Sequence, residues 1–322
     1  MSGAAAPRPQ MVVRGVSTIV ATMVVSSLGD ALVKYVSADF SLWQIYVVRS
    51  LLAIPMIVAL LLAGPRPLIV SRRSLRWALL RSLLLMLMWL AFYAALSTLS
   101  LPVVAAAYYT APLFITLFAA AIGGEAVGIR RWIAILAGFV GVLIILRPAT
   151  DAFSWLTLLP VLSAVFYALA AIVTRTHCAD ERPLALSLAL NLSFLVTGAI
   201  ASAVIAAWPP STSLIVGNPF LLGHWTPMGA HAWGVMAMLA ALIVAISAGI
   251  AGAYQCAPPA VIATFEYSYL AFAAVWSFLL FADVPDPPTI AGMLLIAGAG
   301  LVVVARPKGS NAVPPAQRRA GV

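Results

Sequence analysis

The chain has 322 residues, of which 64% are hydrophobic and only 8% are charged, with a formal net charge of +9. So few charged residues cannot cover the surface of a water-soluble globule of this length. The composition therefore excludes a soluble domain and predicts a membrane protein. The two cysteines, Cys178 and Cys256, lie too far apart, in too apolar a setting, for a disulfide framework or a metal site.

Ten stretches are apolar for roughly 18 residues or more, the length that crosses a hydrocarbon core of about 30 Å as an α-helix. They lack the strict alternation of apolar and polar residues that is typical of transmembrane strands. The predicted fold is an all-α polytopic membrane protein with ten transmembrane helices. We place these at 15 to 36, 42 to 63, 77 to 98, 101 to 122, 130 to 147, 154 to 175, 184 to 206, 231 to 253, 257 to 281 and 287 to 305.

Most basic residues lie in the predicted loops and tails and do not form one patch. Fourteen of the eighteen fall on one side of the membrane if both termini are cytoplasmic, which is the positive-inside pattern. This distribution explains the net charge without a nucleic-acid partner. The fourteen are Arg8, Arg14, Arg66, Arg72, Arg73, Arg76, Arg130, Arg131, Arg175, Arg182, Arg306, Lys308, Arg318 and Arg319.

The second half of the chain repeats the first, since GVLIILRP at 141 to 148 aligns with GLVVVARP at 300 to 307. Each repeat holds five predicted helices, and an odd number makes the second copy insert upside down. This inverted duplication is the design of secondary transporters. The predicted organisation is a cytoplasmic tail (1–14), a first repeat (15–148), a second repeat (149–307) and a cytoplasmic tail (308–322).

Two segments carry a family resemblance. AAAYYTAPLFITLFAAAIGGEAVGIRRWIAILAGFVGVLIILRP (105 to 148) and APPAVIATFEYSYLAFAAVWSFLLFADVPDPPTIAGMLLIAGAGLVVV (257 to 304) resemble the two repeats of EamA-type members of the drug/metabolite transporter superfamily. The resemblance covers nearly the whole chain. It implies two inverted five-helix bundles around a central cavity, in a bacterial cell inner membrane. It leaves the cargo open among amino acids, nucleotide-like metabolites, flavins and drugs.

Apart from arginines at the helix ends, five charged residues fall within predicted helices: Asp30, Lys34, Arg49, Arg81 and Glu266. Each costs about 2.5 to 3.5 kcal/mol at the bilayer centre on insertion scales, so such groups usually pair or line a cavity. Asp30 and Arg49 both lie roughly 10 Å below the outer interface. They therefore form either a fixed ion pair between the first two helices or direct contacts to a solute. Lys34 and Arg81 are expected to snorkel.

The repeat alignment gives these residues counterparts. Tyr167 aligns with Asp30 and Asn191 with Arg49, so only the first half keeps the charges. If these positions line one cavity, it is asymmetric and can orient a polar solute. Glu266, expected near the midplane, aligns with Tyr108. It is read as a proton carrier, as a counter-charge for the substrate, or as a carboxyl group bonded between helices.

Aromatic residues are numerous within the predicted helices, and paired tyrosines occur at matching positions of the fourth and ninth. They indicate an aromatic-walled cavity for a planar or amphipathic molecule, although packing alone is the alternative. The predicted substrate or ion pathway is Asp30, Arg49, Trp89, Tyr93, Tyr108, Tyr109, Tyr167, Asn191, Glu266 and Tyr267.

Small residues on the fifth helix of each repeat predict close packing within the chain first and a homodimer contact second. They are Ala134, Ala137, Gly138, Gly141, Ala297, Gly298 and Gly300. Pro112 predicts a kink in the fourth helix. The aligned loop carboxylates Glu125 and Asp283 are expected to cap or orient the helices that follow.

The only long connection, 208 to 230, is rich in proline and glycine and lies outside on this topology. It is either an extracellular lid or an interfacial loop anchored by Trp208 and Trp225.

Catalytic motifs are missing from the sequence. His177, His224 and His231 fall in loops or at helix ends, and neither HExxH, GxSxG nor a phosphate-binding GxxxxGK[ST] occurs. The chain is therefore predicted to be a secondary transporter, not an enzyme, without cofactor or metal, and with a small-molecule solute and membrane lipid as partners. A vitamin- or nucleoside-like cargo such as riboflavin or S-adenosylmethionine is favoured. An amino-acid or drug exporter and an intramembrane lipid-modifying enzyme are the alternatives.

Overall fold

The computed structural model describes residues 9–64, 72–111, 113–115, 117–118, 129–146, 155–178, 181–256 and 265–304, and all regular structure within them is helical. The helices are α1 (Pro9–Val36), α2 (Leu42–Leu62), α3 (Arg72–Leu96), α4 (Leu101–Tyr108), α6 (Ile129–Leu146), η1 (Trp155–Leu158), α7 (Leu159–His177), α8 (Pro183–Ala207), α9 (Thr212–Gly217), α10 (Pro219–Leu222), α11 (Ala230–Cys256), α13 (Ser268–Phe281) and α14 (Pro287–Val304).

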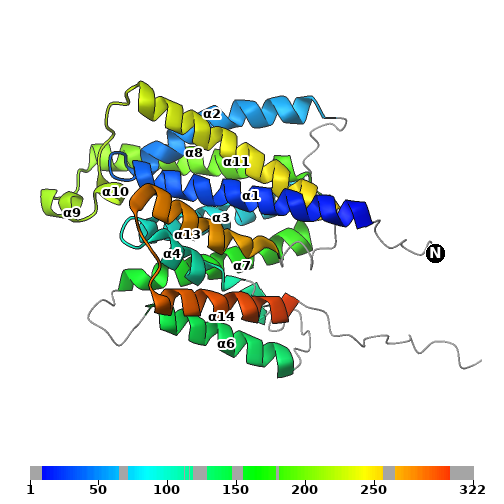
Figure 1. Cartoon of the computed structure of the whole chain (residues 1–322). Coiled ribbons are helices and arrows are strands. Elements are labelled where there is room, and N and C mark those ends of the chain that lie inside the picture. The colour runs from blue at the N-terminus through cyan, green and yellow to red at the C-terminus, as the bar shows by residue number, and fades with distance from the viewer. Residues whose placement is uncertain are drawn as a thin grey trace, which may run out of the picture.

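The long helices run side by side, and the first turn of α1 and the last turn of α14 lie at the same end of the bundle (Figure 1). Among the described residues, six helices are long and apolar enough to cross a membrane, in α1, α2, α3, α7, α8 and α11. Four shorter apolar helices lie between or beside them, at Leu101–Ile115, Trp132–Leu146, Ser268–Phe281 and Pro287–Val302. The prediction of an all-α, multi-pass membrane protein is confirmed.

Local chemistry sets several helix starts. The Ser41 side chain accepts a bond from the Gln44 amide and caps α2, while proline occupies the first turn of α4, α7 and α8. The Asp286 side chain accepts from the Thr289 amide, 3.2 Å away, at the start of α14. The expected cap at Asp283 was therefore wrong, because Asp286 lies closer to the helix. Glu125 falls outside the described residues.

Helix pairing brings the two halves of the chain together. The closest-packed pairs are α6 with α14, α3 with α7, α1 with α11 and α2 with α8. Each pair joins one helix from the first half to one from the second, and Figure 1 shows α6 and α14 side by side along one edge. The core therefore forms between the halves, and neither half is a separate body.

Two glycines set the distance between α6 and α14. A Cβ atom on Gly292 would lie 2.8 Å from the Gly141 carbonyl oxygen, and one on Gly141 would lie 3.0 Å from the Gly292 carbonyl oxygen. Only glycine at both positions allows the backbones to approach this closely. Gly141 was among the small residues expected to pack within the chain. Gly292 was not.

Two predicted helices are interrupted. α4 ends at Tyr108, a turn follows at Tyr109 and Thr110, and residues 113–115 are helical again. Likewise a turn at Tyr267 separates residues 265–266 from α13. The first interruption lies beside the kink expected in the fourth helix, whereas the one at Tyr267 was not expected. Pro112 lies outside the described residues, but proline has no N–H to offer the Tyr108 carbonyl, which accounts for the first interruption.

Two cations within predicted helices have acceptors in the protein. The Lys34 Nζ donates to the Leu99 carbonyl at 3.0 Å and lies 3.7 Å from the Asp283 carboxylate. The Arg81 Nε donates to the Thr174 hydroxyl at 2.8 Å. Each side chain finds its acceptor on a neighbouring segment of the protein, which the sequence position alone does not reveal.

The glycine contact between α6 and α14 is testable. Gly292→Ala should lower the free energy of unfolding by about 1–3 kcal/mol, since the added methyl group meets a backbone oxygen that cannot move away. Thermal unfolding of the purified protein in detergent measures the change. Gly298→Ala, on the same helix but with nothing within 4 Å of the added atom, is the matched control. Equal stability of the two variants would contradict this account.

Candidate functional site

Asp30 is the centre of the buried polar side chains. It lies on α1, only 5% exposed. Its Oδ1 accepts a bond from the Tyr93 hydroxyl of α3 at 3.1 Å, and its Oδ2 accepts one from the Tyr269 hydroxyl of α13 at 2.5 Å. Both carboxyl oxygens are thus satisfied by tyrosines, and three helices meet at one carboxyl group. Hydroxyl donors of this kind replace the water that a buried carboxyl group loses.

Asp30 and Arg49, both of which the structure describes, do not form an ion pair, so the alternative of a fixed ion pair was wrong. Arg49 is near enough to interact electrostatically with Asp30, but its guanidinium group lies over two rings. Its Cζ is 5.0 Å from the Phe194 ring centroid and 5.6 Å from that of Tyr46. The Arg49 side chain leaves α2 on the side that faces α8. Cation–π contacts therefore hold it at the α2–α8 interface.

Asn191, the aligned counterpart of Arg49, also lies at this interface. It is fully buried on α8, and its Nδ2 donates to the Ser187 carbonyl at 2.9 Å. Phe194 is three residues further along, on the same face of the helix. Helix periodicity therefore places Asn191 on the side of α8 that faces Arg49, while a shared role of the two residues in one site stays a prediction.

Aromatic rings connect this interface to the other half of the bundle. In this series of rings, the centroids of neighbouring rings lie 4.6 to 6.4 Å apart. Such spacings are typical of favourable edge-to-face and offset pairs. The connected rings are Phe194, Tyr46, Tyr93, Trp89, Phe92, Tyr108, Tyr167, Tyr109, Tyr267 and Tyr269.

Glu266 lies just before the turn at Tyr267 and is half-buried. Its carboxyl group interacts electrostatically with the hydroxyl groups of Tyr108, Tyr109 and Tyr167. Tyr109 connects the two carboxyl groups, since it interacts electrostatically with Glu266 and its ring stacks on that of Tyr269, which binds Asp30. All three readings of Glu266, as a proton carrier, as a counter-charge for the substrate or as a carboxyl group bonded between helices, stay predictions.

Tyr267 has a packing role in this structure. Its ring lies against α14, and its hydroxyl group occupies the space that a side chain on Gly300 would need. Tyr267 also contacts its aligned counterpart Tyr109, with ring centroids 5.7 Å apart. The two tyrosines at the interrupted helices therefore meet.

Four residues of the site were not predicted: Tyr46, Phe92, Phe194 and Tyr269. Tyr269 follows Tyr267 by two residues, which in a regular helix would place the two side chains on different faces. No sequence signal connects Tyr269 with Asp30, which is 239 residues away. The apolar runs around Tyr46 and Phe194 gave no sign that their rings would face a buried cation.

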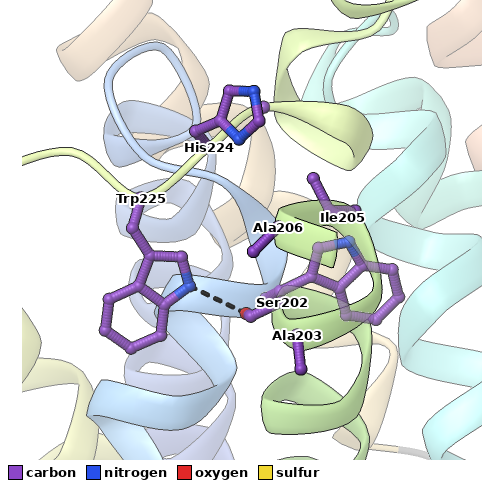
Figure 2. Close-up of a pocket in the computed structure, with 8 residues that line it drawn as sticks. Ser202, Ala203, Ile205, Ala206, His224 and Trp225 are labelled. Atoms are coloured by element: carbon purple, nitrogen blue, oxygen red, sulfur yellow. Dashed lines mark hydrogen bonds between the residues drawn. The ribbon is translucent and has the colours of Figure 1, made fainter. Parts of the chain in front are cut away.

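A separate cavity of about 340 Å³ lies where α2 and α8 meet the long connection (Figure 2). The Trp225 indole donates to the Ser202 hydroxyl at 2.7 Å, and His224 lies above. The Gln44 side chain exchanges two bonds with the Thr226 backbone, at 2.8 and 3.0 Å. The connection is thus docked on α2, while Trp208 and Trp225 remain 75% and 49% exposed.

No metal centre is indicated, since no three His, Cys, Asp or Glu side chains gather suitably within the described parts of the chain.

The family model that matches and the relatives described below carry the names of transporters. The model of the EamA-like transporter family matches residues 13–147. A riboflavin transporter of Rhizobium johnstonii is 30% identical over 83% of this chain and 81% of its own length. An S-adenosylmethionine uptake transporter of Rickettsia prowazekii is 22% identical, covering 90% and 92%. The pseudopaline exporter CntI of Pseudomonas aeruginosa is 26% identical, covering 88% and 93%.

The fold also occurs among solved structures. A protein crystal structure with 16% sequence identity covers 92% of this chain and 98% of its own, with a TM-score of 0.57. At this identity the likeness concerns the fold alone.

The hydrogen bond between Asp30 and Tyr269 predicts strong coupling between the two residues. Asp30→Asn and Tyr269→Phe should each lower the free energy of unfolding by about 1–3 kcal/mol. The double variant should lose clearly less free energy of unfolding than the sum of the two single losses, because both changes remove the same hydrogen bond. Thermal unfolding in detergent measures the wild type, the two single variants and the double variant. Asp30→Asn with Gly298→Ala, whose added atom meets nothing within 4 Å, should be additive. Additive losses for Asp30 and Tyr269 would refute the bond.

Proposed function

The chain belongs to the EamA-like transporter family and transports a small metabolite, and we propose that it does so by alternating access between two inverted five-helix repeats. The names of the relatives indicate a transporter and not an enzyme. The single observation that carries the proposal is the buried series of tyrosines and ionisable residues between the halves of the bundle.

Helix pairing supports the proposed repeats, 15–148 and 149–307. In the proposed repeats, the helices α1, α2, α3, α4 and α6 correspond in this order to α7, α8, α11, α13 and α14. Replacing each helix by its counterpart changes the pair α1–α11 into the pair α7–α3. Both pairs occur. The same exchange maps α2–α8, α4–α13 and α6–α14 onto themselves, and these pairs also occur. The six long and four shorter apolar helices together make up the ten helices proposed here.

A planar, polar cargo fits the site best. Asp30 offers a carboxyl group, Arg49 a cation and the tyrosines flat surfaces with hydroxyl groups, a combination that suits a heteroaromatic solute. Relatives are named for riboflavin and for S-adenosylmethionine, and each of these compounds contains a fused heterocycle. We therefore propose a vitamin- or nucleoside-like cargo. Export remains the second candidate, because another relative is named as an exporter.

The chain is a multi-pass membrane protein, and we place it in the bacterial cell inner membrane with both termini cytoplasmic. The basic loops support this orientation. Exposed leucines such as Leu136, Leu143 and Leu294 on α6 and α14 face lipid. We propose this outer face for any homodimer contact, since the Gly141–Gly292 face is occupied within the chain.

Topology is testable with reporters. A reporter fused after Lys308 should be cytoplasmic, and one inserted near Asn218 should be external, because the basic residues favour the cytoplasmic side. Accessibility to a membrane-impermeant label measures both. Detection of the two reporters on the same side would contradict the ten-helix arrangement.

Purified protein in liposomes tests transport directly, with a panel of riboflavin, S-adenosylmethionine, nucleosides, amino acids and drugs. Accumulation of none would refute the proposed function, and turnover of a lipid would favour the enzymatic alternative.

Glu266→Gln separates two roles of this carboxyl group in the same liposomes. If Glu266 couples transport to protons, the amide should abolish gradient-driven uptake but preserve exchange between equal concentrations, since it bonds but cannot titrate. If Glu266 neutralises a cationic cargo, exchange should weaken as well. Wild-type values in both assays would leave Glu266 with a packing role only.

A further inference from the structure

The interface between α2 and α8 contains buried polar atoms that have no hydrogen-bond partner. They include the Tyr46 hydroxyl, the Arg49 Nε and the Asn191 Oδ1. All three side chains are at least nine-tenths buried, at 0%, 3% and 0% exposure. Buried polar groups in proteins are nearly always bonded, so several unbonded ones in one contact call for a partner that binds there.

These atoms have defined chemical characters. Because Asn191 Nδ2 donates to the Ser187 carbonyl, the amide oxygen of Asn191 is the atom left without a partner. It can only accept a bond, whereas Arg49 Nε can only donate one. The interface therefore offers one donor and one acceptor, together with a Tyr46 hydroxyl that can do either.

Aromatic rings hold these groups in one place. Phe194 lies 5.0 Å from the Arg49 guanidinium carbon and 4.6 Å, between ring centroids, from Tyr46. Asn191 is on the same face of α8 as Phe194, one turn earlier. Tyr46 is in turn 6.4 Å from Tyr93, which binds Asp30. The polar atoms thus adjoin the site described above.

We propose that Arg49 and Asn191 form a subsite that binds the edge of a planar heterocycle in which a carbonyl group is next to an N–H, as in a lactam or imide. Arg49 donates to the carbonyl oxygen, Asn191 accepts from the N–H, and the Tyr46 and Phe194 rings cover the ring faces. The inference rests on the proposed transport function and narrows its cargo to this chemical class.

An anionic group fits less well. A carboxylate or phosphate would satisfy Arg49, but it would turn a negative oxygen toward the Asn191 acceptor. A ring edge with both a carbonyl group and an N–H satisfies both atoms at once. Entry requires α2 and α8 to move apart, and such movement between repeats is what alternating access provides.

Uptake of riboflavin and N3-methylriboflavin into liposomes tests the subsite, because methylation removes the N–H and keeps the carbonyl groups. The wild-type protein should take up riboflavin at least about tenfold faster. Asn191→Leu should bring this ratio close to one, whereas Asn191→Asp, which keeps an acceptor, should preserve it. Arg49→Gln should slow both compounds to a similar extent. Asn218→Leu, in the outer connection, is the control and should behave as wild type.

Folding of each variant is followed by thermal unfolding in detergent, and Asn191→Ala replaces Asn191→Leu if the latter unfolds. Equal uptake of the two flavins by the wild type, or a ratio unchanged in the Asn191 variants, would overturn the subsite. Uptake of other solutes, with no uptake of riboflavin or uridine, would overturn it while leaving the transport function intact. Failure to move any solute would instead reject transport itself.

Discussion

The hydrogen bonds to Asp30 are the interaction on which the rest of the arrangement depends. A carboxyl group within a membrane bundle needs donors from the protein, because water does not reach it there. Tyr93 comes from the first half of the chain and Tyr269 from the second, so satisfying Asp30 requires the halves to pack together. It also leaves Arg49 without a direct carboxylate partner. Arg49 therefore turns to the rings at the α2–α8 interface.

Features that depend on local sequence could be predicted, and features that depend on helix rotation could not. The second helix was expected at 42 to 63 and occurs as Leu42–Leu62, because apolar length and the Ser41 cap are encoded within the segment. An ion pair between Asp30 and Arg49 was one of the two alternatives that their equal depth suggested. Depth does not fix which way a side chain points about its helix axis, and Arg49 points to Phe194. Tyr269 was missed for the same reason.

Divergence between aligned positions gives a duplicated bundle an asymmetric site. In the proposed repeats, Arg49 and Asn191 occupy equivalent positions, and both lie at the contact between α2 and α8. Two arginines there would offer donors only. One cation and one amide offer one of each, which a solute can match in only one orientation. Asp30 and its counterpart Tyr167 differ in the same way, since one carries a carboxyl group and the other a phenol.

Unbonded polar atoms also bear on how binding drives movement. A closed interface in which Arg49 Nε and Asn191 Oδ1 lack partners is higher in free energy than one in which both are bonded. A solute that supplies the missing partners stabilises the arrangement that holds it, and so shifts the population of conformations toward that arrangement. A solute without the matching edge leaves these two atoms without partners, and the free energy of the interface stays high. Selectivity and conformational change would then have one physical origin, the unsatisfied atoms between α2 and α8.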